Sequence, residues 1–131
     1  MEKALNDEVY KVWYSADDSC VMMNWHGYAN SRQFREGTEL MLSELIANKA
    51  HKVLGDIKNM VLIGQDDQSW LLSDFFPRAI KAGCKAFALV RPDYYFNKIA
   101  VETVNHKVGD QVQIRMFDEL AQASEWLSGI D

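Results

Sequence analysis

The sequence predicts an α/β fold with the element order ββαβαβαβα, in which helices flank a mixed, mostly parallel sheet. The prediction rests on an apolar hairpin near the N-terminus, on apolar strands that alternate with helical patterns, and on one continuously apolar strand. Alternating strands and helices favour parallel pairing through right-handed crossovers, and the hairpin adds an antiparallel strand. The 131 residues are close to the commonest domain size, so we expect 1–131 to form a single domain.

The first predicted elements are the hairpin and a long helix. Segments 8–14 and 20–25 are rich in β-branched and aromatic residues, and a turn-forming cluster separates them. Asn30 is a favourable N-cap with Gln33 in capping-box position, which predicts a helix over 31–48. Its apolar stripe consists of Phe34, Thr38, Met41, Leu42 and Leu45.

Three further strands follow from the apolar runs. Residues 52–57 form a strand that leads into a loop at 58–65. The run 86–90 is apolar throughout, which is typical of a central strand covered on both faces. Residues 112–116 alternate between apolar and polar side chains and indicate a half-buried strand nearer an edge.

A second helix is predicted over 67–82, where an apolar stripe recurs at helical spacing and Gly83 provides a C-cap. Pro77 lies inside this helix and should kink or split it near 72–73. The stripe consists of Leu72, Phe75, Phe76, Ala79 and Ile80.

Two more helices complete the chain. Pro92 and Asp93 open a third helix that Gly109 closes, and Asp118 caps a final helix that ends at Gly129. Their apolar stripes are Phe96, Ala100, Val104 and Val108 in the third helix, and Leu120, Ala123, Ser124 and Leu127 in the last.

Composition and charge limit the classes of function. The net charge of −5 and the scattered basic residues argue against a nucleic-acid partner and against a membrane-surface role. No apolar run is long enough for stable membrane insertion, and no export signal is evident, so we expect a cytoplasmic protein. Cys20 and Cys84 lie in apolar segments and are expected to be buried, reduced thiols.

The element order with its opening hairpin and five short segments together carry a resemblance to a known fold. The segments are Trp25-His26-Gly27-Tyr28, Phe34-Arg35-Glu36-Gly37, Asp56 with Asn59-Met60, Trp70, and Phe76-Pro77-Arg78-Ala79. They resemble the STAS domain, the fold of sulfate transporters and anti-sigma factor antagonists, and in particular small stand-alone bacterial STAS-like proteins. The resemblance covers residues 8–128 and is specific for fold more than for activity.

The resemblance implies a switch at the helix that follows the third strand. In anti-sigma factor antagonists a partner kinase phosphorylates a serine there, within an Asp-Ser-Ser/Thr-Gly pattern. This chain departs from that pattern, because Asp66 and Asp67 stand where the serine would be. Ser69 is the nearest hydroxyl, and helical spacing places it on the core-facing stripe, one turn before Leu72, where a kinase would reach it poorly.

Other chemistry finds little support in the sequence. Asp56 ends a strand, and we interpret it as a carboxylate that hydrogen-bonds loop amides, with a chemical role as the alternative. His26 is the histidine best placed for a cleft, and a structural, hydrogen-bonded role is favoured. Asp66 and Asp67 suit a helix N-terminus and exclude a bound phosphate. No motif predicts a catalytic residue, a metal site or a cofactor.

Aromatic residues near the predicted strand ends carry the functional hypothesis. Trp70 falls opposite the apolar stripe and should be partly exposed or packed under a loop. Exposed aromatic rims are typical of protein interfaces and of apolar pockets. We expect a non-enzymatic regulatory module that binds a protein partner or self-associates. The alternative is a carrier or sensor of a small apolar or lipid-like ligand between the second and third helices. The rim or pocket residues are Trp70, Phe75, Phe76, Tyr94 and Tyr95.

Overall fold

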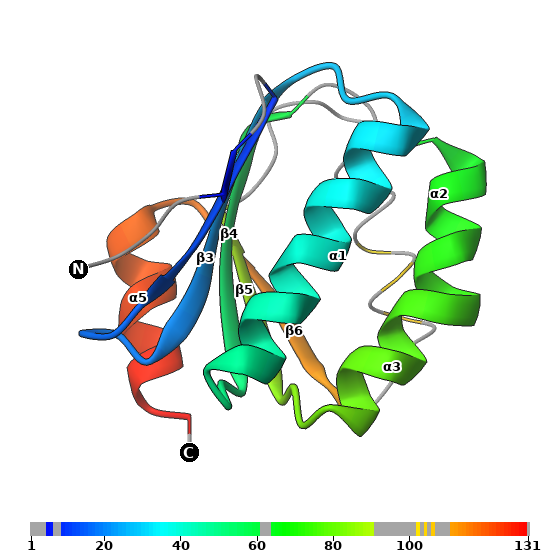
Figure 1. Ribbon diagram of the computed structural model, residues 1–131. Helices are drawn as coiled ribbons and strands as arrows, with labels where there is room; N and C mark the ends of the chain where they lie inside the picture. The colour runs from blue at the N-terminus through cyan, green and yellow to red at the C-terminus, as the bar shows by residue number, and fades with distance from the viewer. Residues whose placement is uncertain are drawn as a thin grey trace.

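The computed structural model describes residues 5–6, 9–60, 64–90 and 111–130, together with Glu102, Val104 and His106, which are helical (Figure 1). Its elements are β1 (Leu5–Asn6), β2 (Tyr10–Ser15), β3 (Cys20–Gly27), α1 (Ser31–Ala47), β4 (Lys52–Met60), α2 (Gln65–Trp70), η1 (Leu71–Phe75), α3 (Phe76–Lys81), β5 (Ala86–Val90), β6 (Gln113–Phe117) and α5 (Leu120–Ser128).

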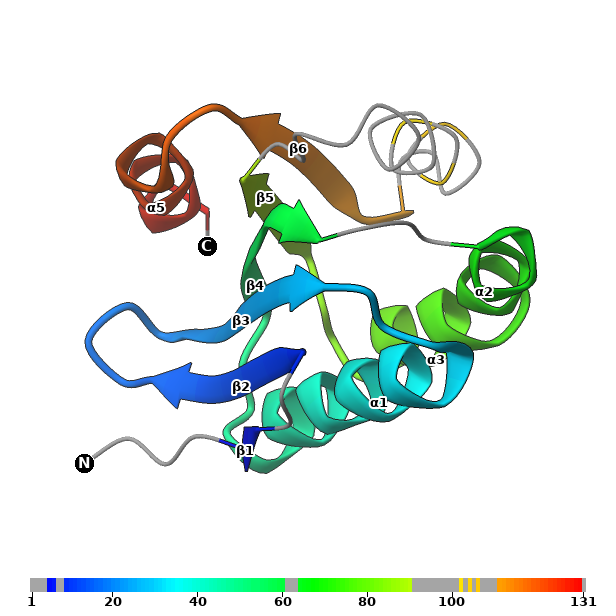
Figure 2. The same cartoon turned by 90° about the horizontal axis from the view of Figure 1, so that it is seen from above.

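The strands form one sheet in the order β1-β2-β3-β4-β5-β6. The pairs β1–β2 and β2–β3 are antiparallel, and β3 to β6 pair in parallel. Helices α1, α2 and α3 cover one face of the sheet, while α5 covers the other (Figure 2). The predicted α/β class with a mixed, mostly parallel sheet is therefore confirmed, and β1 is an addition that the sequence pattern did not reveal.

Helix α1 lies on the sheet through a close contact at Gly37. A Cβ atom at this position would come within 2.6 Å of the Trp25 ring, so a larger residue would push the helix away from the sheet. The predicted capping box is present, because Asn30 Oδ1 accepts the Gln33 amide at 2.8 Å and Gln33 Oε1 accepts the Asn30 amide. The predicted apolar stripe of α1 is buried as expected.

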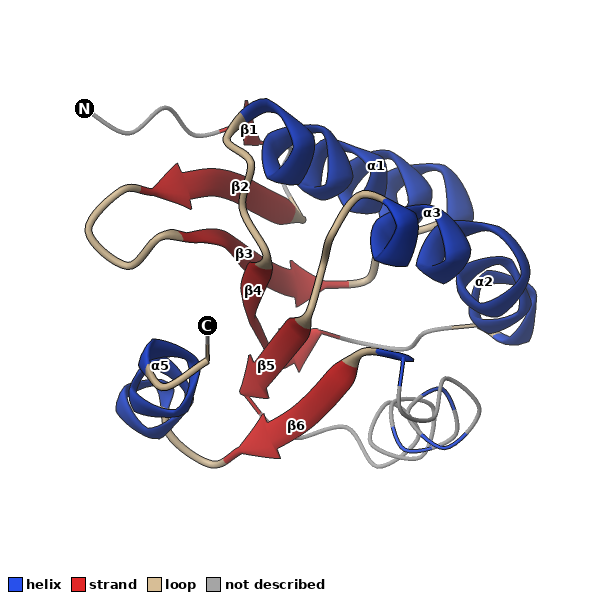
Figure 3. Ribbon diagram, turned by 90° about the horizontal axis from the view of Figure 1, so that it is seen from below, coloured by secondary structure: helices blue, strands red, loops and turns tan. Residues whose placement is uncertain are grey.

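The predicted interruption of the second helix takes the form of a π-helical turn, η1, between α2 and α3. Figure 3 shows α2 and α3 on the same side of the sheet as α1. The Phe76 amide donates to the Leu71 carbonyl, five residues back. Pro77 explains the break, since it has no amide hydrogen for the carbonyl four residues earlier. The helix ends as predicted at Gly83, whose positive φ of 103° suits a glycine.

Several boundaries and one buried position differ from the sequence prediction, and α2 for instance begins at Gln65 in place of residue 67. Strand β4 continues to Met60, so the predicted loop begins later than residue 58. The N-cap of α5 is Glu119 in place of Asp118, because Glu119 forms a capping box with Gln122. Leu120 was predicted on the buried stripe of this helix, but it is exposed because it is the first residue after the cap.

The third predicted helix lies mostly outside the described residues. Val104 is helical and buried, in agreement with its place on the predicted stripe. Within the part of the chain that the structure describes, no helix combines the length and the hydrophobicity that crossing a membrane requires.

Candidate functional site

Asp56 lies inside β4, four residues before the strand ends, and not at a strand end as predicted. The register between β3 and β4 shifts just after it, because Asn24 pairs with Asp56 whereas His26 pairs with Asn59. Asp56 Oδ1 accepts the Lys58 amide at 3.2 Å within this irregular stretch. The predicted bond to a nearby backbone amide is thus present, and it stabilises a bulge in the strand.

Asp66 and Asp67 lie in the first turn of α2, where carboxylates interact favourably with the helix dipole. Asp66 is exposed, but Asp67 is only 5% exposed. Asp67 accepts hydrogen bonds from Ser31 Oγ at 3.1 Å and from Arg35 Nε at 3.0 Å. Asp67 therefore links α2 to the start of α1. Of the two acids that stand where the family's serine would be, Asp66 is open to a partner and Asp67 is not.

Ser69 was predicted to face the core, and this prediction is wrong, because Ser69 is exposed. The π turn is the physical reason. It adds a residue to one turn and so rotates the buried face of the preceding segment. Phe75 therefore meets Trp70, five residues earlier, with ring centroids 5.9 Å apart. The face of α2 that packs inward carries Asp67 and Trp70, and Ser69 lies away from it.

His26 is exposed on β3, so its predicted location in a cleft is wrong. The bulge in β4 places it beside Asn59 in the register, away from the helical layer. Tyr28 follows immediately and is 62% exposed, the highest value among the exposed large hydrophobic residues that the structure describes. The sequence did not single out Tyr28, although its place directly after a strand exit is a usable signal.

The predicted aromatic rim divides into three groups. Trp70 is half-buried, as predicted, and the Arg35 guanidinium lies 5.2 Å from its ring centroid. Phe75 and Phe76 are 1% and 7% exposed, so they cannot form an open interface. They belong to a chain of contacting rings that runs from α1 to β5. The remaining members, Tyr94 and Tyr95, lie outside the described residues.

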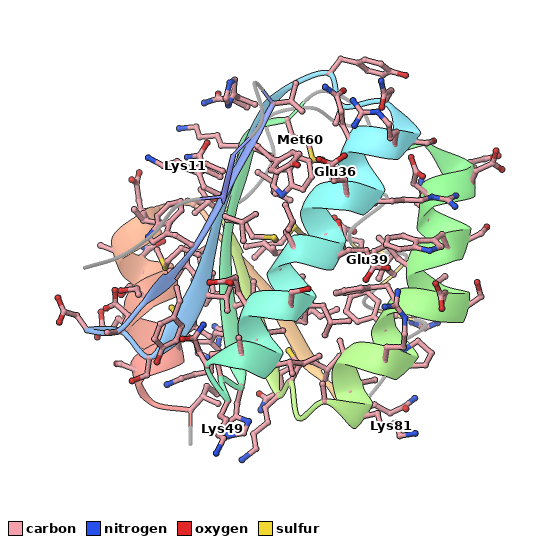
Figure 4. All side chains as sticks on the ribbon, viewed as in Figure 1. Lys11, Glu36, Glu39, Lys49, Met60 and Lys81 are labelled. Atoms are coloured by element: carbon pink, nitrogen blue, oxygen red, sulfur yellow. The ribbon has the colours of Figure 1, made fainter. Side chains whose placement is uncertain are left out.

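A cavity of about 90 Å³ lies between the sheet and the layer of α1, α2, η1 and α3. Figure 4 shows Met60 in this space, between β4 and α1. The described residues that line the cavity are Met23, Trp25, Phe34, Thr38, Met41, Ile57, Met60, Gln68, Leu71, Phe75, Phe76, Phe87, Leu89, Val104 and Ile114.

The walls of this cavity are almost wholly apolar. Thr38 and Gln68 are the polar side chains among the described lining residues, and none of these residues carries a formal charge. Thr38 Oγ1 donates to the Phe34 carbonyl at 2.7 Å, which satisfies its hydroxyl hydrogen. Gln68 belongs to no motif in the sequence, so no local signal marks it as a lining residue. The methionines Met23, Met41 and Met60 have the flexible, polarisable side chains that suit an adaptable apolar site.

Ion pairs at the surface join α3 to α1. Arg78 Nη1 donates to Glu39 Oε1 at 2.8 Å, and the same guanidinium also contacts Asp74. The hydrogen bond to Glu39 raises the pKa of Arg78 above its usual range. Glu39 lies on the side of α1 that faces α3 (Figure 4). Together with the Asp67–Arg35 pair, this contact holds the helical wall of the cavity against α1 at two points.

The cysteines are buried and free, as predicted, with Cys20 and Cys84 on opposite faces of the sheet. Burial raises the pKa of the Cys84 thiol to about 12. A thiol with this pKa is almost entirely protonated near neutral pH and is a poor nucleophile. Within the described parts of the chain, no three His, Cys, Asp or Glu side chains gather closely enough to share a metal ion.

One solved structure resembles this architecture along nearly its whole length. It is an uncharacterized protein from the DUF3478 family with a SpoIIAA-like fold, from Shewanella loihica. The match covers 97% of this chain and 92% of that one, with a TM-score of 0.57 and 15% sequence identity. This chain has a SpoIIAA-like fold. The SpoIIAA-like fold is STAS-like, so the fold that the sequence resemblance implied is confirmed. No protein-family model and no curated protein matches the sequence.

In this SpoIIAA-like domain, α2 has an inner and an outer side. Gln68 borders the cavity from the inner side, while Asp66 and Ser69 are exposed on the outer side. The exposed Tyr28 lies three residues before Ser31, which is bonded to α2 through Asp67. The cavity and the exposed residues of α2 therefore lie on opposite sides of one short helix.

Proposed function

We propose that this STAS-like domain binds a small apolar molecule in the cavity between the sheet and helices α1 to α3. The single observation that carries the proposal is the cavity itself, with its volume of about 90 Å³ and its almost wholly apolar walls. Empty apolar cavities stay dry, and one of roughly 150 Å³ binds benzene or xenon. The methionines in the wall allow it to adapt to the shape of a ligand.

The helical wall offers further support for a binding role. It includes the π turn η1, a distortion that often accompanies functional sites. Catalysis finds less support, because Asp56 and His26, the sequence candidates for acid–base chemistry, do not line the cavity. We therefore favour a carrier or sensor over an enzyme.

Methionine-methyl NMR tests this proposal directly, because Met23, Met41 and Met60 all line the cavity. Titration with cyclopentane should shift these methyl signals and leave Met22 on the opposite sheet face unaffected. Ile57→Phe should remove the binding by filling the space. Ile80→Phe is the matched control, since Ile80 is half-buried on α3 and lies outside the described cavity lining. Unchanged methyl signals in the wild-type protein would contradict the proposal.

A second candidate function is recognition of a protein partner or of another copy of the chain. The observation that favours it is the exposure of Tyr28, three residues before Ser31, which is bonded to α2 through Asp67. Asp66 and Ser69 are also exposed on α2, in the segment that resembles the switch of STAS-like anti-sigma factor antagonists. Interfaces are enriched in tyrosine at their centres. Asp67 would support such a surface indirectly by fixing α2 against α1.

Sedimentation equilibrium tests the self-association form of this candidate. If copies associate through this surface, Tyr28→Ala should weaken association at least fivefold, whereas Ile46→Ala, an exposed apolar residue at the other end of α1, should have no effect. A monomer at all concentrations would refute self-association. For the partner form, exposure of the protein to cell extract with ATP, followed by mass spectrometry, should reveal a phosphate on Ser69; its absence would count against a phosphorylation switch.

A further inference from the structure

We propose that two copies of this chain pair through the outer edge of β6, so that their two sheets join about a two-fold axis. The inference goes beyond the proposed function, because it concerns the edge of the sheet and needs no ligand in the cavity. It rests on the contrast between the two edges of the sheet, on the backbone groups that β6 directs outward, and on the cation that Arg115 presents beside them.

The two edges of the sheet differ in length and regularity. Strand β1 at one edge has only two residues, whereas β6 at the other edge has five. The register of β6 with β5 runs without a shift from Gln113 to Phe117, and β6 contains no proline. Figures 2 and 3 show β6 as the outermost strand on its side of the sheet, and among the described residues no strand pairs with its outer side. Short length, bulges and prolines usually keep edge strands from pairing with other chains, and β6 has none of the three.

The backbone of β6 directs hydrogen-bonding groups toward this open side. The Gln113 amide donates to the Lys85 carbonyl at 3.0 Å, on the side of β5. Successive residues of a strand direct their amide hydrogens and carbonyl oxygens to alternate sides. Ile114 and Met116 therefore point two amide hydrogens and two carbonyl oxygens away from β5. An antiparallel second copy of β6 would offer the same groups in return.

Symmetry and charge select one register for this pairing. A closed dimer uses the same surface on both copies, so the two β6 strands must run antiparallel about a two-fold axis. With Arg115 opposite Arg115 of the second copy, like charges would meet, which is destabilising. With Ile114 opposite Ile114, Phe117 would have no β6 residue facing it. With Met116 opposite Met116, each Arg115 faces Phe117 of the second copy, and this is the register we propose.

The surroundings of Arg115 fit an aromatic partner across the edge. Its guanidinium lies 5.3 Å from the centroid of its own Phe117 ring and 5.9 Å from that of Trp126 on α5. Arg115 is exposed and Phe117 is only half-buried, so both are accessible to a second chain. Side chains that face each other across antiparallel strands have Cβ atoms about 4.5–5.5 Å apart. Each Arg115 would therefore reach the Phe117 ring of the other copy and gain a second cation–π contact.

Sedimentation equilibrium tests the proposal, and we expect the wild-type chain to form dimers as its concentration rises. Met116→Pro should weaken dimer formation at least tenfold, because proline removes the outward amide hydrogen from both copies of the pair. The bonds to β5 should persist, since the Met116 amide points away from β5, and circular dichroism checks that the variant folds. A wild-type chain that is monomeric at every concentration would overturn the proposal.

Arg115→Ala tests the register without altering the backbone. It should weaken dimer formation about fivefold, because two symmetric cation–π contacts are lost. Arg32→Ala is the matched control, since Arg32 is an exposed arginine on α1, and it should have no effect. Tyr28→Ala should also leave this dimer intact. If Tyr28→Ala abolished association while Met116→Pro and Arg115→Ala did not, the β6 pairing would be overturned and the surface around Tyr28 would be supported.

Crosslinking decides the register even where Met116→Pro does not fold. In a hydrogen-bonded antiparallel pair, the Cα atoms of the two opposite residues 116 would be about 5.5 Å apart, within reach of a disulfide. Met116→Cys should therefore give a covalent dimer in air, seen on a non-reducing gel, while the buried Cys20 and Cys84 do not react. Gln113→Cys is the control, since in this register the two copies of residue 113 lie about 20 Å apart. Equal crosslinking of the two variants, or none by Met116→Cys, would overturn the proposal.

Discussion

The two faces of the sheet are packed in different ways, although the same strands supply both. Along β5, Phe87 and Leu89 face the helices α1 to α3, whereas Ala86 and Ala88 face α5. On the α5 side the contact is between small residues, since Ala123 of the helix meets the alanines of the strand. On the other side, bulky rings and methionines meet and leave the cavity.

This difference in packing indicates which face of the sheet mainly stabilises the fold and which face can bind a ligand. Small side chains allow a helix to approach a sheet closely, and such contacts fill space efficiently. Bulky aromatic rings of fixed shape cannot fill every gap between three helical segments and a twisted sheet, so space remains. The α5 side has a hollow as well, of about 240 Å³, but its lining includes the charged residues Asp17, Asp18 and Lys52. We therefore assign the binding of an apolar ligand to the face under α1 to α3, where the walls are almost wholly apolar.

The largest expected effect tests how much stability each face supplies. Phe75→Ala should destabilise the fold by about 3–5 kcal/mol, because Phe75 is almost completely buried under the helical layer and its removal enlarges the cavity. Trp126→Ala on α5 should cost only about 1–2 kcal/mol, because Trp126 is half-buried. Urea denaturation of both variants measures the two values. If both variants lost the same free energy of unfolding, the two faces would not differ in how much they stabilise the fold.

Added side-chain volume should have a smaller effect on stability, and this effect should differ between the two faces of the sheet. Ala88→Leu should destabilise the protein by about 1–3 kcal/mol, since Ala88 is completely buried in the cluster against α5. Ile57→Phe adds volume as well, but toward the cavity, and should be neutral or stabilising. Thermal unfolding of the two variants gives the comparison. A loss of stability in both would mean that the cavity cannot accept added volume.

The last prediction concerns the pH dependence that Cys84 contributes on the helical face, which has no effect near neutral pH. The folded protein raises the pKa of this thiol from its ordinary value of 9.0 to about 12, so the folded state holds the proton more strongly than the unfolded chain. Below pH 9 the thiol therefore leaves stability unchanged. Above pH 9 the stability should fall by about 1.4 kcal/mol per pH unit until the folded thiol also ionises.

Comparison with Cys84→Ala isolates this contribution, because the other groups that titrate above pH 9 are common to both proteins. The difference in unfolding free energy between wild type and variant should be constant from pH 6 to 8.5 and should narrow from pH 9 to 10.5. If the difference in unfolding free energy stayed constant across the whole pH range, burial would not raise the pKa of the Cys84 thiol.

The regular elements could be predicted because local signals for them are strong. The capping box at Asn30, the apolar run of β5 and the helix stop at Gly83 each depend on residues close in the chain, and each is present. Burial of Asp67 could not be predicted in this way. Its partners Ser31 and Arg35 are more than 30 residues away, and only the tertiary fold brings them together.

Candidate site residues were harder to predict because their orientation depends on helix phase. A continuous α-helix would have turned Ser69 inward, and one π turn reverses this orientation. The sequence signalled an interruption through Pro77, but a proline does not specify whether a helix bends, breaks or widens. The cavity could be predicted only as a site between the second and third helices. Its volume could not be predicted, because empty space arises from the side chains of many distant segments. Phe75 and Phe76 were expected at the rim of a site, but both are core residues. Their burial also depends on distant segments that fold over them.

The order of the strands in the sheet is the same as their order along the chain. Each strand therefore pairs with the strand that precedes it in the chain, across at most about 25 intervening residues. No strand has to be inserted later between two that have already paired. Folding rates rise as contacting residues lie nearer one another in the chain. The sheet can extend one strand at a time from the β2–β3 hairpin toward β6, and a chain emerging from the ribosome would present its strands in the order in which they pair.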